Sequence, residues 1–533
     1  MRAGKMRLGW RTGIGVVLSL ALVTGSAAPA GASLLGGLVG GLIGTTTGLV
    51  GGVLGIVTAG WDDGATTAPT PMSDVVKAVG ADRAWGRGYD GSGVTVAVID
   101  SGVAAVDGLT ASGKVVNGPD LSFESQSDAY RYLDTFGHGT HMAGIIAGRD
   151  VGTQGSFKGV APGARIVSLK VATREGAADV SQVIAAIDWV VQHRNDPGLN
   201  IRVLNLSYGT DGTQDYLDDP LAMAVESAWR NGIVVVAAGG NDGTQRSSLV
   251  NPATDPYVLA VGAVDLAGTV SAGDDQVAPF SSRGSLTRGV DVVAPGVSIA
   301  SLRDPGSAID DAHPSAVVDG RFFRGSGTSQ AAAVASGAAA VLLDARPDLT
   351  PDQVKALLEN TATPLASTDL QGQGAGRINV DLATRSLVPS ISAVRQVWPQ
   401  ATGTGSLEGA RGTNHLAEDG IDLAGEEDVM GMPWNGVAWA PRSASGTAWS
   451  GGSWNGADWT STCFCSTSWS GSAWTGKTWT GKTWTGKTWT TGEWAGKTWT
   501  GKTWTGKTWT GKTWTGKTWT GKTWTTPMAS SAR

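Results

Sequence analysis

The run Val94-Thr-Val-Ala-Val-Ile99, which leads into Asp100, decides the fold. A short run rich in Val, without regular polar alternation, predicts a strand that is buried on both faces. Three similar runs follow at residues 166–171, 201–206 and 233–237, and amphipathic helical stripes at residues 180–191 and 221–229 separate the later ones. This alternation predicts an α/β fold, a parallel sheet flanked by helices on both faces.

Polar residues follow these runs where an open parallel sheet binds ligands, beyond the carboxyl ends of its strands. Asp100 ends the first run, Ser207-Tyr-Gly209 follows the third, and Gly239-Gly-Asn241 follows the fourth. In two further Gly-rich turns, His138 and Ser329 each open a predicted helix. A hydroxyl at a helix N-terminus lies where backbone N–H groups and the helix dipole favour negative charge.

These residue types together specify acyl transfer. A serine hydroxyl becomes a good nucleophile when a base removes its proton, and a carboxylate fixes the tautomer of a histidine base. Asp100, His138 and Ser329 supply one group of each kind, and the Asn241 side-chain amide with the Ser329 N–H would stabilise the oxyanion. Taken singly, each triad residue has a structural alternative, a helix cap for Asp100 and Ser329 and a turn residue for His138.

The sequence around these residues carries a longer series of motifs. They are Ala81-Asp-Arg-Ala-Trp85, Val94-Thr-Val-Ala-Val-Ile-Asp-Ser-Gly102, His138-Gly-Thr-His-Met-Ala-Gly144, Asn205-Leu-Ser-Tyr-Gly209, Val236-Ala-Ala-Gly-Gly-Asn241, Phe280-Ser-Ser-Arg-Gly284 and Val293-Ala-Pro-Gly296. Over about residues 74–388 the chain resembles the subtilisin-like serine proteases (subtilases, peptidase S8), in the form of a secreted, actinobacterial-type member with C-terminal Trp repeats.

The resemblance implies a subtilisin-like fold and a set of site residues. Asp100, His138 and Ser329 would be the triad and Asn241 the oxyanion donor. The walls of the pocket for the substrate side chain would come from Ser207, Tyr208, Gly209, Ala238, Gly239 and Gly240, whose backbone edges would pair with an extended peptide. The implied partners are protein or peptide substrates.

The resemblance implies no cofactor for the chemistry. Many subtilases bind structural calcium, but no acidic loop here has calcium-ligand spacing, so the metal site stays unassigned. We interpret the pairs Asp218-Asp219, Asp274-Asp275 and Asp310-Asp311 as solvated turns, and His141 as a structural residue that bonds within its own helix start.

Two features depart from the family pattern. Gln330 stands where the serine block normally has Met, and Ala333 with Val334 replaces its Pro-His. In addition, residues 33–72 do not resemble the folded pro-domain of secreted members. These departures keep a second hypothesis open, a non-catalytic cell-wall-binding or adhesive protein built on a protease-like scaffold. A third hypothesis is a protease that cleaves only itself during export.

The first 32 residues have the pattern of a secretory signal peptide, with four cations, an apolar run at residues 14–23 and a small-residue cleavage site at Ala30-Gly-Ala32. Residues 33–72 form a Gly-rich apolar segment, with Gly36, Gly40, Gly44, Gly48 and Gly52 spaced by four. That spacing fits a helix face that contacts a membrane partner, and a flexible spacer fits it equally well. We expect residues 73–388 to form the catalytic domain of a secreted protein.

Residues 389–432 mix Gly, Ser, Thr and acids, and we interpret them as an extended, solvated linker. In the tail, residues 433–533, Trp recurs with a spacing of five from Trp434 to Trp524 and occupies seventeen of the nineteen positions in that series. Exposed indoles beside Lys and Thr suit cell-wall polysaccharide or an anionic polymer, with avidity from repetition. A five-residue β-solenoid and a low-complexity tail are the alternatives.

Composition limits the remaining classes. With 41% hydrophobic residues and 16% charged residues in 533, neither uniform disorder nor a multi-span membrane protein fits. The net charge is −6, and residues 466–533 carry nine Lys and one Arg against one Glu. That basic tail lacks Arg before its last residue, so we expect no nucleic-acid partner. The two cysteines, Cys463 and Cys465, are too close for an easy bridge and too few for a metal site.

Overall fold

The computed structural model describes residues 60–61, 68–126, 130–150, 157–367, 369–418 and 421–459, and short strands between residues 478 and 524. The expected signal peptide, most of the Gly-rich segment and both cysteines lie outside the described residues. None of the helices in these ranges has both the length and the apolar character needed to span a bilayer.

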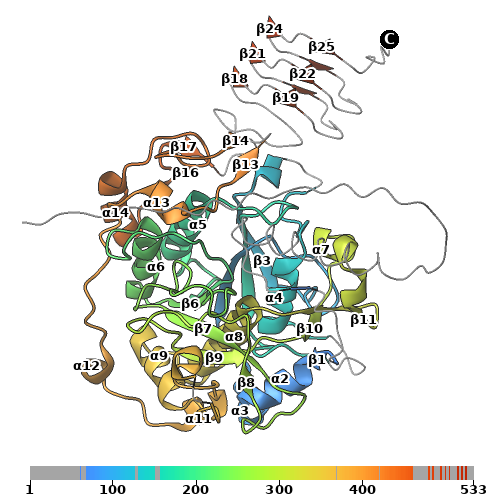
Figure 1. The fold of residues 1–533 in the computed structure, drawn as a ribbon, viewed down its shortest axis with the longest axis vertical. Helices are drawn as coiled ribbons and strands as arrows, with labels where there is room; N and C mark the ends of the chain where they lie inside the picture. The colour runs from blue at the N-terminus through green and yellow to red at the C-terminus, as the bar shows by residue number, and fades with distance from the viewer. Residues whose placement is uncertain are drawn as a thin grey trace, which may run out of the picture. The chain divides into compact units, whose positions relative to one another are not determined.

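An eight-stranded sheet forms the centre of the fold (Figure 1). Its strands are β2 (Thr95–Asp100), β3 (Val115–Asp120), β4 (Arg165–Lys170), β5 (Ile201–Leu206), β6 (Val234–Ala238), β7 (Leu259–Asp265), β8 (Gln276–Val277) and β9 (Val292–Pro295). They pair in the order β3-β4-β2-β5-β6-β7-β8, with β9 also beside β7, and only β8 runs antiparallel to its neighbour. The four predicted runs are β2, β4, β5 and β6, and almost all their residues are buried.

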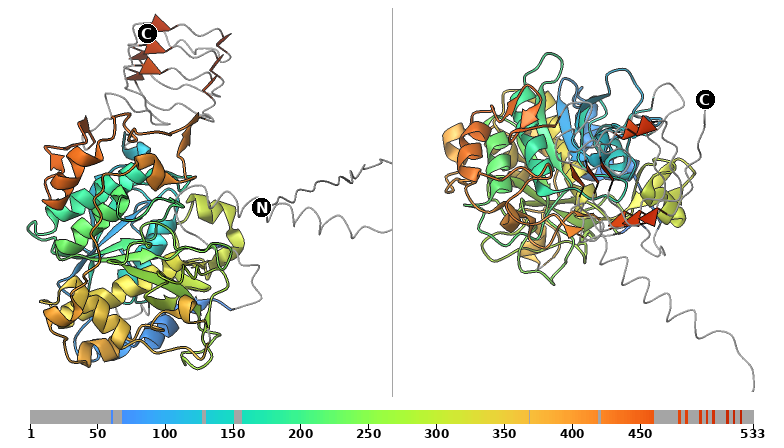
Figure 2. Two further views of the ribbon diagram at one scale, coloured as in Figure 1. Left: turned by 60° about the vertical axis from the view of Figure 1, so that its left-hand side comes forward. Right: turned by 90° about the horizontal axis from the view of Figure 1, so that it is seen from above.

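Helices cover both faces of this sheet (Figure 2). On one face α4 (His138–Ala147) packs against α8 (Thr328–Ala345), which crosses β5, β6 and β7. On the other, α5 (Val180–His193) packs against α6 (Pro220–Arg230). Asp179 and Asp219 cap the N-termini of α5 and α6. The predicted α/β fold with helices on both faces is confirmed.

A smaller sheet leads into the turn before Ser329. It pairs β1 (Thr70–Pro71), β10 (Ile299–Leu302), β12 (Phe322–Gly325) and β11 (Val317–Val318) in that order. The other elements of the body are α2 (Met72–Val79), α3 (Ala81–Trp85), α7 (Ala308–Ala312), α9 (Pro351–Asn360), α10 (Leu370–Gln373), α11 (Val380–Arg385), α12 (Ile391–Val394), α13 (Leu407–Arg411), β13 (Ala417–Glu418), β14 (Ile421–Asp422), α14 (Gly436–Ala444), β15 (Trp449–Ser450), β16 (Ser453–Trp454) and β17 (Ala457–Asp458).

Residues 401–432 are not part of the extended, solvated linker that composition predicts for residues 389–432, although residues 389–400 are largely exposed. Arg411 in α13 is fully buried, and its Nε lies 2.6 Å from Oδ2 of Asp179, the residue that caps α5. Leu407 and Met430 are also fully buried in the main core. The prediction was wrong because Gly, Ser and acids suggest solvation, whereas a few apolar side chains and one buried ion pair hold this segment on the domain.

The first tryptophans of the predicted tail are also part of the domain, so its folded body runs past residue 388 to Trp459. Five of them are less than one-tenth exposed, namely Trp434, Trp439, Trp449, Trp454 and Trp459. Trp439 and Trp454 each donate an indole N–H to Oδ2 of Asp188 in α5, at 2.7 and 2.8 Å. Ser443 donates its hydroxyl to Oδ1 of the same carboxylate at 2.6 Å. We call this group the Asp188 clamp.

Farther along the tail, two-residue strands pair in parallel. Thr478–Trp479 pairs with Thr498–Trp499, which pairs with Thr518–Trp519, and Thr483–Trp484, Thr503–Trp504 and Thr523–Trp524 form a second stack. Glu493–Trp494 pairs with Thr513–Trp514. Paired strands are twenty residues, or four five-residue repeats, apart in the sequence. The tail is thus a β-rich repeat array.

Candidate active site

Asp100 and His138 meet between the end of β2 and the start of α4. Nδ1 of His138 lies 2.8 Å from both carboxylate oxygens of Asp100, and both side chains are buried. A carboxylate only accepts, so Nδ1 carries the proton and Nε2 keeps a lone pair. Nε2 has no hydrogen-bond partner among the described residues. This imidazole is oriented as a base with its accepting nitrogen free.

Asp134 holds the start of α4 and was missed by the sequence analysis. Its Oδ1 accepts the Gly137 N–H and its Oδ2 accepts the Thr140 N–H, each at 2.7 Å. Burial raises the pKa of Asp134, and the hydrogen bonds oppose that shift. The signal that could have revealed it is an acidic residue just before a predicted helix start, where carboxylates cap backbone N–H groups.

Ser329 is the second residue of α8 and is fully buried. Its Oγ lies 3.5 Å from the carbonyl oxygen of Ser207, and the Ser207 hydroxyl donates to the Ser329 carbonyl at 3.2 Å. These two contacts bring the end of β5 to the start of α8, and α8 also packs against α4, the helix that begins at His138.

Asn241 is oriented as a donor. Its Oδ1 accepts the Thr328 N–H at 2.9 Å and the Thr328 hydroxyl at 3.0 Å. A backbone N–H can only donate, so the amide oxygen must face Thr328 and the amide nitrogen must face away. That nitrogen is buried and has no partner in the described part of the chain. A buried unpaired donor is costly, and an oxyanion that forms during reaction would satisfy it.

The residues predicted to form the pocket walls are either hydrogen-bonded into the protein or buried in its core. The backbone groups of Gly239 and Gly240 bond inward, since the Gly239 N–H donates to Val261 and the Gly240 N–H to the Thr328 hydroxyl. Ala238 ends β6 and is buried. Tyr208 is 3% exposed, and burial raises the pKa of its phenol well above the usual range. Its ring therefore packs in the core, and any contact of the 207–209 segment with substrate would come from backbone.

A short piece of the chain that precedes the domain lies against this site. Gly60 and Ser326 exchange both backbone hydrogen bonds, at 3.3 and 3.0 Å, as an antiparallel bridge three residues before Ser329. Trp61 is 5% exposed, and its ring packs edge-on against the rings of His138 and His141, with centroids 5.8 and 5.3 Å away. No periodic pattern around residues 60–61 predicts this contact.

The family departures are accommodated without a break in α8. Ala333 and Val334 are fully buried within the continuous helix. Gln330 is also fully buried, and neither its amide oxygen nor its nitrogen has a hydrogen-bond partner among the described residues. A Cβ on Gly325 would lie 2.7 Å from both Nε2 of Gln330 and the ring of Trp61. The amide of Gln330 therefore faces the same space as Trp61.

His141 has the structural role expected, but with partners outside its helix start. Its Nε2 donates to the carbonyls of Phe323 and Ile299, at 3.0 and 3.3 Å. Burial, followed by the neighbouring His138, lowers its pKa to about 3. His141 therefore stays neutral and ties α4 to β10 and β12.

In the described ranges, no group of three or more His, Cys, Asp or Glu side chains is placed to hold a metal ion. The interpretation of the Asp pairs as solvated turns was wrong for one member of each. Asp219 caps α6, Asp275 pairs with Arg377, and Asp310 pairs with Arg303. Burial raises the pKa of Asp275 to about 6 despite the guanidinium of Arg377. These carboxylates have structural partners in the protein itself.

The chain is similar to several known proteins. The model of the subtilase family matches residues 91–376. The serine protease AprX of Bacillus subtilis (strain 168) is 38% identical over 302 residues, 56% of this chain and 67% of AprX. Subtilisin DY of Bacillus licheniformis is 36% identical over 307 residues, 57% of this chain and 96% of that protein. Fervidolysin from Fervidobacterium pennivorans, a keratinolytic enzyme related to subtilisin, aligns with a TM-score of 0.47 and 29% identity, over 59% of this chain and 46% of that chain.

Proposed function

The chain belongs to the subtilase family of serine proteases, and on that basis we propose that it is a secreted endopeptidase whose triad is Asp100, His138 and Ser329. One observation carries the assignment: a buried imidazole bonded through Nδ1 to a carboxylate, with Nε2 unpartnered among the described residues. His141 also leaves one nitrogen without a described partner, but its other nitrogen bonds backbone carbonyls, whereas His138 bonds a carboxylate that could stabilise an imidazolium.

In the proposed mechanism Ser329 Oγ attacks the carbonyl carbon of the scissile bond, and its proton passes to His138 Nε2. Asp100 stabilises the resulting imidazolium. The oxyanion is held by the Asn241 amide and the Ser329 N–H. His138 then protonates the leaving amine as the C–N bond breaks. In the second half of the reaction His138 takes a proton from a water molecule that attacks the acyl-enzyme, and it returns this proton to Ser329 Oγ as the ester bond breaks.

The bridge between Gly60 and Ser326 supports a protein or peptide substrate. It is an antiparallel backbone pairing, formed by the chain's own segment, at the edge that leads to Ser329. Backbone pairing of this kind binds extended peptides largely independently of their side chains. The same contact supports the narrower alternative that the enzyme cleaves its own N-terminal segment.

We propose secretion from the signal-like first 32 residues, and retention at the cell surface by the Trp repeats. Repeated weak contacts with wall polysaccharide or an anionic polymer would gain avidity. The proposal includes no nucleic-acid partner, and no cofactor for the chemistry.

The test is labelling of the exported protein with a fluorophosphonate probe, beside a Ser329→Ala variant and with hydrolysis of added casein as a second readout. We expect labelling that disappears in the variant, together with casein hydrolysis. Labelling without casein hydrolysis would favour self-cleavage only. Absence of labelling in folded protein would overturn the enzyme assignment and favour the non-catalytic, wall-binding alternative.

A further inference from the structure

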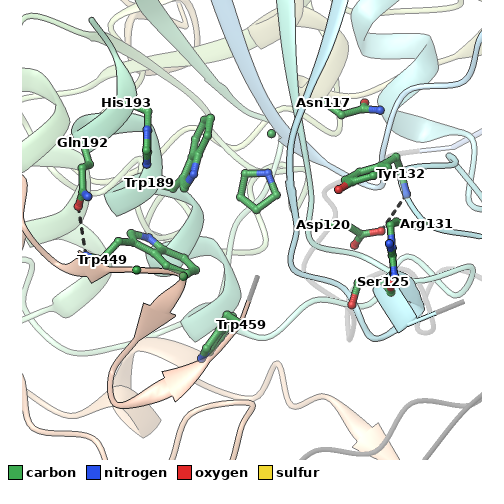
Figure 3. Close-up of a pocket in the computed structure, with 14 residues that line it drawn as sticks. Asn117, Asp120, Ser125, Arg131, Tyr132, Trp189, Gln192, His193, Trp449 and Trp459 are labelled. Carbon is green, nitrogen blue, oxygen red and sulfur yellow. Dashed lines mark hydrogen bonds between the residues drawn. The ribbon is translucent and has the colours of Figure 1, made fainter. Parts of the chain in front are cut away.

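A cavity of about 550 Å³ lies between the edge strand β3 and the C-terminal end of α5 (Figure 3). None of Asp100, His138, Ser329 or Asn241 lines it. Trp449, Gly451, Gly452 and Trp459 form one of its walls. These residues lie beyond the 91–376 range that matches the family, so the cavity combines the protease domain with a segment outside that match.

Flat aromatic surfaces face this cavity from opposite sides. Trp189 stacks on His193, with ring centroids 4.5 Å apart and planes at 25°. Tyr132 stands across from them and is 37% exposed (Figure 3). Trp189 lines the cavity, and the stacked imidazole fixes the plane of its ring.

The ring of Tyr132 is held in place by its backbone. Its φ is +63°, a conformation that costs energy for any residue with a Cβ. The Tyr132 N–H donates to Oδ2 of Asp120 at 2.9 Å, while Oδ1 of Asp120 accepts from Ser122. A strained residue fixed by a buried carboxylate gives the cavity a preorganised aromatic wall.

Polar groups with unused hydrogen-bonding capacity lie between the rings. Gln192 accepts the Trp449 N–H through Oε1 at 3.2 Å, and its Nε2 makes no bond within the described residues. The exposed amide of Asn117 and the hydroxyl of Tyr132 are likewise not engaged by described residues. Amides and a phenol provide both donors and acceptors without net charge.

The chemistry of the walls argues against a peptide or an anionic ligand. Pro119 interrupts the row of N–H donors on β3, and the pairing of β3 with β4 shifts register between Asn117 and Asp120. A peptide strand could not add to such an edge continuously. One cation, Arg131, lies near the buried carboxylate of Asp120, so the walls have no excess of positive charge.

We propose that this cavity binds a neutral, β-linked pyranose chain. The aromatic faces would stack on the flat C–H faces of the sugar rings, and the amides of Asn117 and Gln192 would bond to ring hydroxyls. The volume lies in the range of small-molecule sites. The site is independent of the protease triad and distinct from the repeats beyond Trp459.

The test is calorimetric titration of the full-length Ser329→Ala protein with cellotetraose, and with the α-linked maltotetraose as a comparison. Tyr132→Gly removes the ring and tolerates the positive φ, and Tyr130→Gly is its matched control because Tyr130 is 44% exposed and does not line the cavity. We expect cellotetraose to bind, about fivefold more weakly in Tyr132→Gly and unchanged in Tyr130→Gly. Gln192→Ala, which leaves the backbone in place, should also weaken binding.

Several outcomes would overturn the proposal. One is no heat of binding at concentrations up to about 10 mM. Another is equal affinity in the parent, Tyr132→Gly and Gln192→Ala, which would move binding to the repeats. Equal affinity for maltotetraose would remove the preference for β-linked chains. Unchanged melting temperatures in the variants would show that any loss of affinity comes from the cavity and not from unfolding.

Discussion

The ring of Trp61 packs edge-on against that of His138, at an interplanar angle of 84°. A residue from before the catalytic domain thus packs on the proposed base. Because only 5% of Trp61 is exposed at this place, we expect an incoming substrate to displace it.

Trp61→Ala should therefore speed the reaction of Ser329 with a fluorophosphonate. Loss of the buried indole should shift the segment toward release and raise the labelling rate about tenfold. The control is Trp398→Ala, since Trp398 is 53% exposed. Equal rates in both variants and the parent would mean that Trp61 does not limit access.

Asp100→Asn should reduce kcat roughly 10⁴-fold with little change in stability. An asparagine keeps the shape, but it can present a donor to Nδ1 of His138 and so favour the wrong tautomer. The measurement is peptide hydrolysis with a melting curve of the same sample. A loss below tenfold would remove Asp100 from the triad.

Asn241→Ala should lower kcat by about 10²–10³ and leave KM almost unchanged, because the amide acts on the oxyanion and not on the bound substrate. Steady-state kinetics with one peptide substrate give both constants. If KM rose while kcat stayed constant, Asn241 would be a substrate-binding residue instead.

Gln330→Met should stabilise the protein by about 1–3 kcal/mol, because it removes two buried polar atoms that have no partner among the described residues. Gln182→Met is the matched control with the opposite sign. Gln182 is equally buried, but it donates to the Leu121 and Val171 carbonyls and accepts the Asp179 N–H. Urea unfolding of both variants in Ser329→Ala protein provides the comparison, and destabilisation by Gln330→Met would reveal a partner for that amide.

The Asp188 clamp should make stability depend on pH. Burial raises the pKa of Asp188 to about 6, above its unfolded value of about 4. The neutral carboxyl is thus favoured in the folded state, so this contribution is complete below pH 4 and is lost as pH rises to about 6. Asp188→Asn should remove that dependence, on the order of 3 kcal/mol, between pH 4 and 7. If the free energy of unfolding changed with pH to the same extent in both proteins, this prediction would be wrong.

Sequence patterns predicted the elements whose environment is uniform. β2, β4, β5 and β6 lie within a residue or so of the apolar runs because they are buried on both faces. Of the polar residues that follow them, Ser207 and Asn241 both bond to the start of α8. Asp100, His138, Ser329 and Asn241 could be chosen before the structure because each follows a strand or opens a helix.

Other parts of the site depend on contacts that no local pattern encodes. Trp61 contacts His138, which lies more than seventy residues farther along the chain. Arg411 pairs with Asp179 across an even longer stretch of sequence. Neither segment has a helical or strand period, so its packing comes from single side chains. Trp439 and Trp454 are a further example. Both belong to the five-residue Trp repeat, but their indoles are buried against α5, which the repeat does not predict.

The Asp188 clamp also changes what a break in the chain would do. Leu387 and Val397, on the stretch around α12, are 94% and 86% exposed, so a protease could reach this part of the backbone. Downstream of it, Arg411 and the five buried tryptophans hold residues 401–459 on the domain without any covalent link. A cut there would give two bands on a denaturing gel and one particle on a sizing column, with the repeats still carried by the enzyme.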